Sequence, residues 1–232
     1  MTPKQLATQI RNLLRLLIDS EVAAAAKPVI EQKFGPILRI TWASTDSSSQ
    51  AFYSSRFATL EEYRSFVDAN LYSAILYDGA LVQMSYDFIG HKLAGHRLCY
   101  YPCPFDIDPE LIRSEPIGDL IGLYSDSANI NVNLRTPCRF DYDAQNVAVG
   151  HPSVHMHLNT PECRWPVTHP VSVGEFIKFV FRHFYPNLWA AHDFLRNWPH
   201  VGRRDRTIAI EEETELHVSC GQARIDNSLE AV

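Results

Sequence analysis

Apolar and polar residues alternate with a period of two in several segments, which is typical of β-strands whose two faces meet different surroundings. The clearest segment is 154–158, which reads VHMHL. A strand here would bury the valine, methionine and leucine. It would present His155 and His157 together on the opposite face, with their Cα atoms about 6.5–7 Å apart. The same alternation predicts further strands at residues 37–42, 52–57, 73–77, 81–89, 96–101 and 130–143.

Helical spacing of apolar residues marks other segments. We expect an amphipathic N-terminal helix at about residues 3–26. Thr59 and Ser172 each open a Ser/Thr-x-x-Glu capping box before an apolar stripe, and the two helices that follow would cover the apolar side of the sheet. The pattern predicts an α+β fold: an antiparallel β-sheet with helices packed mainly on one face, plus the N-terminal helix.

Length and composition fit one large domain, since the chain has 232 residues and 46 % of them are hydrophobic. We therefore expect a single α+β domain over residues 1–232 with a poorly ordered C-terminal tail. Five cysteines form no recognisable disulfide framework, and we find neither a signal peptide nor a run of about 18 apolar residues. These features favour the cytoplasm and predict no membrane partner.

The formal charge of −6 argues against a surface that is basic throughout and coats nucleic acid. Arg203, Arg204 and Arg206 nevertheless form a local basic cluster, so nucleic acid stays among the partners considered.

The polar faces of the predicted strands have an unusual composition. An ordinary solvated face is rich in Thr, Lys and Glu, whereas these faces favour Asn, Asp, Arg and His, which carry out acid–base chemistry and bind phosphates or metals. The set comprises Gln83, Ser85, Asp87, Asn131, Asn133, Arg135, Asp141, Asp143, His155 and His157.

His155 and His157 are close enough to share zinc or another divalent metal ion with a third ligand. Segment 139–143 also alternates, and if it pairs with 154–158 as a hairpin, Asp141 or Asp143 can supply that ligand.

Two arginines, Arg135 and Arg164, would border such a centre and hold phosphate oxygens by bidentate hydrogen bonds. A structural zinc site is an alternative, with the ligands His151, His155, His157 and Cys163. A third interpretation is an ordinary polar sheet face with hydrogen-bonded histidines.

Six fragments follow one another between Leu81 and Pro186: LVQMSYDF, HRLCYYPCP, RFDYD, HPSVHMHLN, CRWPV and SVGEFIKFVFRHFYP. In this order they resemble an uncharacterised bacterial family catalogued as domain of unknown function twenty-two ninety. The resemblance implies a bacterial, cytoplasmic protein and leaves its activity open.

Two functions of different classes are compatible with these patterns. One is a binding or assembly subunit of a multi-component system of the toxin or phage-defence type, whose aromatic residues contact a protein partner or a second copy of the chain. The other is a phosphodiester hydrolase, such as a nuclease, with its site on the strand of His155 and His157. Its water would be activated by a metal ion or by a histidine that an aspartate orients.

Overall fold

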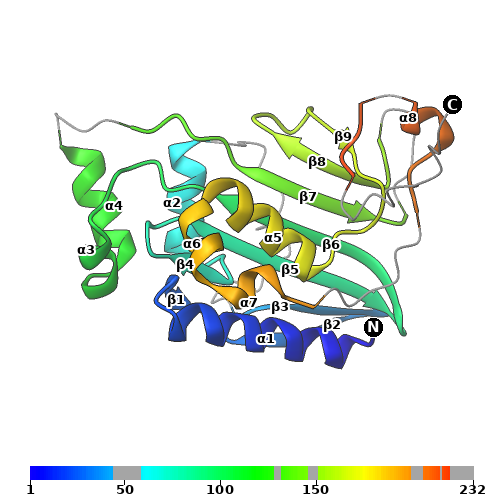
Figure 1. The fold of residues 1–232 in the computed structure, drawn as a ribbon, viewed down its shortest axis with the longest axis horizontal. Coiled ribbons are helices and arrows are strands. Elements are labelled where there is room, and N and C mark those ends of the chain that lie inside the picture. Colours follow the sequence, from blue (N-terminus) through cyan, green and yellow to red (C-terminus); the bar gives the residue numbers. More distant parts are fainter. Residues whose placement is uncertain (44–58, 128–131, 146–150, 200–205, 215, 220–232) are drawn as a thin grey trace, which may run out of the picture.

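An antiparallel sheet forms the centre of the computed structural model, which describes residues 1–43, 59–127, 132–145, 151–199, 206–214 and 216–219 (Figure 1). Its strand order is β1-β4-β5-β6-β7-β8-β9, while β3 also pairs with β5 and carries β2 on its other side. The strands are β1 (Ala23–Ala26), β2 (Val29–Phe34), β3 (Ile37–Trp42), β4 (Ala74–Leu76), β5 (Leu81–Ile89), β6 (Lys92–Tyr101), β7 (Cys138–Asp143), β8 (Val154–Leu158) and β9 (Trp165–Pro166).

The helices complete an α+β fold, as the sequence predicts. Figure 1 shows α1 and the group α5 to α7 on the near side of the sheet. Within the described residues, no helix is both long and apolar enough to cross a membrane. The helices are α1 (Pro3–Asp19), α2 (Leu60–Asp68), α3 (Pro109–Ser114), α4 (Ile117–Asp126), α5 (Val173–Phe184), α6 (Pro186–Ala191), α7 (Asp193–Arg196) and α8 (Ile210–Glu213).

Helix α5 covers the apolar face of the sheet, as its stripe of apolar residues predicts. The Ser172 side chain and Glu175 form the expected capping box at its N-terminus. Phe176 is fully buried, with its ring 6.3 Å from that of Phe140 on β7. The α5 side of the sheet is therefore the main hydrophobic core.

Helix α2 packs on the other face of the sheet, which corrects the expectation that it covers the same side as α5. Tyr63 and Phe66 of α2 contact Tyr101 of β6, with ring centroids 5.8 and 5.6 Å apart. Tyr101 shares its face with Arg97 and Cys99 because side chains alternate along a strand. One face is thus polar near Arg97 and apolar near Tyr101, and α2 covers the apolar end.

Helix α1 ends at Asp19, so the helix predicted at 3–26 is too long. Glu21 has a φ of 56°, in the left-handed region, which ends the helix. Residues 23–26 are β1, and they pair with β4. Alanine prefers a helix by only a fraction of a kcal/mol per residue, which backbone pairing with a neighbouring strand outweighs.

Within the strand predicted over residues 130–143, the described residues 132–137 are not in a strand, and β7 begins at Cys138. A strand with Asn133 and Arg135 on its polar face would bury Val132 and Leu134, but these residues are 48 % and 99 % exposed. Pro137 has no backbone N–H to donate, which prevents a regular ladder immediately before β7.

Strand β6 starts at Lys92 rather than at residue 96. Strands β2 and β9 lie in segments for which no strand is predicted. Predictions for the strand at 52–57, for Asn131, Arg203 and Arg204, and for the tail from residue 220 lie outside the described residues.

Candidate functional site

The polar residues of the central strands form rows across the sheet. Antiparallel pairing places Ser85, Arg97, Asp141 and His155 opposite one another on β5, β6, β7 and β8. The next row contains Arg139 opposite His157. The hairpin expected from the alternation in β7 and β8 is therefore confirmed, and it brings a carboxylate and two imidazoles together.

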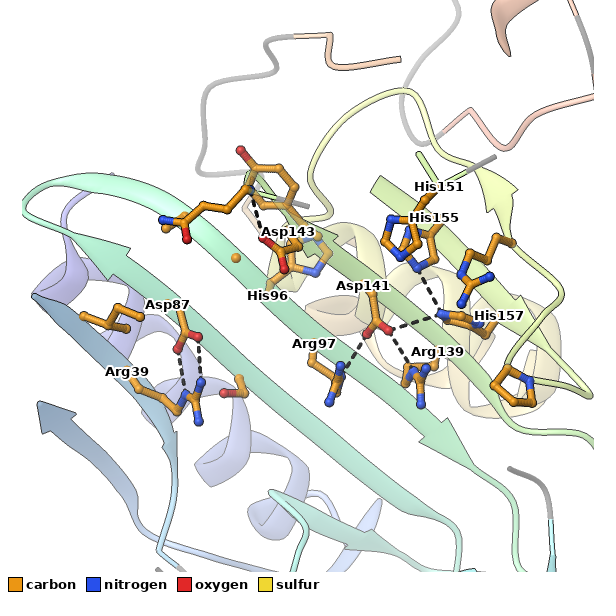
Figure 2. A pocket seen from close by; sticks show the side chains of 18 residues that line it. Arg39, Asp87, His96, Arg97, Arg139, Asp141, Asp143, His151, His155 and His157 are labelled. Atoms are coloured by element: carbon orange, nitrogen blue, oxygen red, sulfur yellow. Dashed lines mark hydrogen bonds and ion pairs between the residues drawn. The ribbon is translucent and has the colours of Figure 1, made fainter. Parts of the chain in front are cut away.

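Asp141 is the centre of a network of ionic hydrogen bonds (Figure 2). Arg97 Nε donates to Asp141 Oδ1 at 3.0 Å, and Arg139 Nε donates to Oδ2 at 3.0 Å. His157 Nε2 lies 3.3 Å from the same Oδ2. One buried carboxylate thus holds two guanidinium groups and one imidazole.

The two histidines of β8 meet through their ring nitrogens. His155 Nε2 and His157 Nε2 are 3.0 Å apart. His155 Nδ1 lies 2.8 Å from the Pro152 carbonyl oxygen, which can only accept, so Nδ1 carries the proton. In the neutral ring, His155 Nε2 therefore presents a lone pair towards His157. Both rings are buried, and β9 pairs with β8 beside them.

Burial and charge set the protonation of this network. Burial lowers the pKa of His155 to about 4 and outweighs the opposing effects of the Pro152 carbonyl and Asp141. Burial alone would raise the pKa of Asp141, but the charges of Arg97 and Arg139 and the hydrogen bond from His157 hold that pKa far below its ordinary value. At neutral pH, His155 is a neutral imidazole and Asp141 is a carboxylate.

A pocket of about 570 Å³ opens over the network (Figure 2). It extends from Arg39 on β3 to Arg164 in the segment after β8. Arg39 forms a bidentate ion pair with Asp87. The acidic, basic and histidine residues that line it are Arg39, Asp87, Arg97, Arg139, Asp141, Asp143, His151, His155, His157, Arg164 and, from the opposite face of β6, His96.

Two predicted site residues bring buried nitrogens to this pocket. His151 lies beside His155, with ring centroids 4.9 Å apart. Among the described residues, His151 Nδ1 and Arg164 Nε have no hydrogen-bond partner. Such buried groups are uncommon in folded proteins, and a bound water or ion is one of the partners that satisfy them.

The other predicted site residues are divided between the pocket and the rest of the surface. Asp143 lines the pocket, and its Oδ1 accepts from the Gln145 backbone N–H at 2.9 Å. Arg135 instead pairs with Asp106 at 3.1 Å and is not among the lining residues, because the chain before Pro137 is not part of the strand.

The predicted zinc set that included Cys163 is not assembled. In the described part of the chain, the ligand atoms that lie within 4.8 Å of one another belong to Asp141, His155 and His157. Cys163 is in a turn closed by a hydrogen bond from its N–H to the Thr160 carbonyl, and it does not line the pocket.

Arg97 and Arg139 are central to the network but were absent from the predicted site. Arg139 and Asp141 are two residues apart on β7, so they lie on the same face of the sheet. The alternation in this segment is therefore enough to place Arg139 beside Asp141. Arg97 lies 44 residues before Asp141, and only the pairing of β6 with β7 brings the two together.

The depressed pKa of His155 predicts a specific pH dependence of stability. Between pH 7 and pH 5, in buffer with a chelator, the wild type should lose about 1–2 kcal/mol more unfolding free energy than His155→Asn. The unfolded histidine takes up its proton near pH 6.5 and the folded one near pH 4. The stability that this group contributes is therefore complete above pH 6.5 and is lost as the pH falls towards 4.

Urea unfolding at both pH values measures this difference. His91→Asn is the matched control, since His91 is exposed at the β5–β6 turn. An identical pH dependence in the wild type and His155→Asn would contradict a buried, neutral imidazole.

Comparison with known proteins identifies one family. The profile of an uncharacterised conserved protein family, DUF2290, matches residues 21–220. The match includes all nine strands and every residue of the Asp141 network, and it begins after α1. No curated protein and no solved structure gives a significant match.

Proposed function

Because the chain belongs to the DUF2290 family, which is described only as uncharacterised and conserved, we propose its function from the pocket itself. The proposed activity is the hydrolysis of phosphate esters, and of phosphodiesters in particular. The supporting observation is the meeting of Asp141, His155 and His157 within one pocket that arginines also line.

Phosphodiester hydrolysis makes two demands on a site. The attacking water must lose a proton, and the charge on the phosphoryl oxygens must be stabilised in the transition state. The neutral His155 Nε2 is suited to the first demand, either as a base or as a ligand of a water-activating metal ion. Arginines are suited to the second, since a guanidinium can donate two parallel hydrogen bonds to a phosphate.

The arginines of the pocket have different tasks in this proposal. Arg97 and Arg139 each direct Nε to Asp141, which orients the guanidinium groups and leaves them part-buried beside the pocket. Arg164 has a buried Nε without a partner among the described residues, so it is the best placed to bind an incoming phosphate. His151, beside His155, can donate to the same group.

A binding or assembly subunit is the second candidate function. Leu123, Val132 and Leu134 are 67 %, 48 % and 99 % exposed, and the burial of apolar side chains is the dominant favourable term in most protein–protein association. A protein partner or a second copy of the chain could use them. A toxin or phage-defence system would provide such a partner.

A substrate panel tests the hydrolase proposal. The purified protein is incubated with bis-p-nitrophenyl phosphate, p-nitrophenyl phosphate, and single-stranded RNA and DNA, each with zinc, manganese or magnesium and with a chelator. We expect the diesters to be cleaved, and the polymer products will identify the nucleic acid preferred. The proposal is wrong if no ester is cleaved under any of these conditions.

Arg164→Gln should lower kcat/KM for the diester about 10–100-fold. Loss of a charge-assisted hydrogen bond costs about 1.5–3 kcal/mol, and each 1.4 kcal/mol is a factor of ten. Arg135→Gln is the matched control, because Arg135 pairs with Asp106 outside the pocket and its loss should leave kcat/KM unchanged. Equal effects of the two substitutions would remove Arg164 from the site.

A further inference from the structure

We propose that Asp141, His155 and His157 bind a divalent cation, with zinc the best fit, and that the cation binds together with a phosphate group rather than alone. The inference deepens the proposed function, because it names what activates the water and links that group to the substrate. It rests on the distances between the three ligand atoms and on the charges that surround them.

The distances are close to those of a shared zinc ion. Two ligands about 2.0–2.1 Å from a tetrahedral zinc lie roughly 3.3–3.4 Å from each other. His155 Nε2 and His157 Nε2 are 3.0 Å apart, and His157 Nε2 is 3.3 Å from Asp141 Oδ2. Small side-chain rotations would therefore complete three bonds and leave a fourth position for water, which is the arrangement of catalytic zinc sites.

The backbone supports the same assignment. His155 and His157 occupy alternate positions on β8, and Asp141 is opposite His155 on β7, so the three side chains leave one sheet face side by side. The hydrogen bond from His155 Nδ1 to the Pro152 carbonyl is the kind of outer contact that fixes a metal-binding imidazole.

An acid–base pair without metal fits these positions less well. In-line displacement at phosphorus puts the attacking and leaving oxygens on opposite sides of the phosphoryl group. A base and an acid that serve these two oxygens must also stand on opposite sides. Two nitrogens 3.0 Å apart cannot flank a phosphoryl group, but they can meet on one cation.

The charges around the site explain why the cation should not bind alone. Asp141 is the carboxylate of the proposed ligand set, and it already compensates Arg97 and Arg139, whose side chains are only 17 % and 13 % exposed. A divalent cation adds to this positive excess in a part-buried pocket, where charge is expensive. A phosphate beside the cation, held by Arg164, offsets that excess. By linkage, each ligand then raises the affinity for the other.

Equilibrium dialysis of the chelator-treated full chain against zinc tests the inference, with dimethyl phosphate as a soluble diester probe. We expect about one zinc per chain, bound roughly 5–150-fold more tightly with the probe than without it, which is the usual range of coupling between two sites. The absence of bound zinc under both conditions, or the same affinity under both, would overturn the inference.

Two substitutions of Arg97 separate the effect of its charge on zinc binding from the effect of changing its side chain. Arg97→Gln removes a positive charge, so it should raise zinc affinity without dimethyl phosphate and reduce the enhancement that the probe gives. Arg97→Lys keeps the charge and should behave like the wild type in both respects. The inference fails if Arg97→Gln, shown to be folded by circular dichroism, binds zinc no more tightly than Arg97→Lys.

The failures of the two proposals can be told apart. Cooperative binding of zinc and dimethyl phosphate by a protein that cleaves no ester would refute the hydrolase and leave the cation site standing. Cleavage by metal-free protein, verified by elemental analysis, together with no zinc bound in dialysis, would refute the cation site and leave the hydrolase standing.

Discussion

Asp141→Ala is expected to lower the free energy of unfolding by about 3–5 kcal/mol, because it leaves two part-buried guanidinium groups without their shared, buried carboxylate. Arg97 and Arg139 each donate Nε to Asp141 at 3.0 Å, and neither side chain is more than 17 % exposed. Asp141 itself is 8 % exposed. Urea unfolding at pH 7, with the slope of the transition compared between variants, gives the difference directly.

Asp87→Ala provides the matched comparison on the same sheet face. The Arg39–Asp87 pair has two hydrogen bonds of 2.7 Å, but it involves one arginine and is 19–23 % exposed. Water can solvate the remaining guanidinium more easily, so the loss should be about 1–2 kcal/mol. A loss in Asp141→Ala no greater than in Asp87→Ala would show that Arg97 and Arg139 are not held by Asp141 in solution.

The parts of the fold that the sequence predicts are those fixed by neighbours along the chain. Strands β3, β5 and β8 and the cap of α5 follow from local alternation or local hydrogen bonding. The hairpin of β7 and β8 is also nearly local, which explains why Asp141, His155 and His157 could be expected together.

The errors arise where distant parts of the chain decide the structure. Residues 23–26 are four alanines, and only the distant strand β4 makes them a strand. The face of the sheet that α2 covers depends on where the polar side chains of β6 give way to apolar ones. The pattern within α2 itself does not show this. Arg97 reaches Asp141 only through the pairing of β6 with β7, across 44 residues of sequence.

Substrate recognition depends on the same long-range pairing. The pocket crosses from β3 to the segment after β8, and its lining residues come from positions 37 to 164. The alternation of a single strand shows which face a residue occupies, but not which residues of other strands lie opposite it. The errors at Arg135 and Arg139 have a nearer cause: Arg135 precedes Pro137 and is outside β7, whereas Arg139 is on β7 and shares its face with Asp141.

His155→Ala is expected to lower kcat/KM for phosphodiesters by about 100- to 10,000-fold, the usual contribution of a group that positions or activates the attacking water. His155 is 3 % exposed, and its Nε2 lone pair is directed to the site by the Pro152 hydrogen bond. His91→Ala at the exposed β5–β6 turn should retain the activity of the wild type. Equal activity of these two variants would remove His155 from the site.

Rescue of His155→Ala shows which chemistry the imidazole provides. A lost metal ligand weakens cation binding, so excess zinc should restore a large part of the activity, whereas a lost base leaves cation binding unchanged. Added imidazole can replace either group, but without metal it can replace only a base. Recovery that requires zinc would therefore identify His155 as a ligand, and recovery by imidazole in the presence of a chelator would identify it as the base. The 3.0 Å contact with His157, which allows one cation to bind both rings, leads us to expect recovery that depends on zinc.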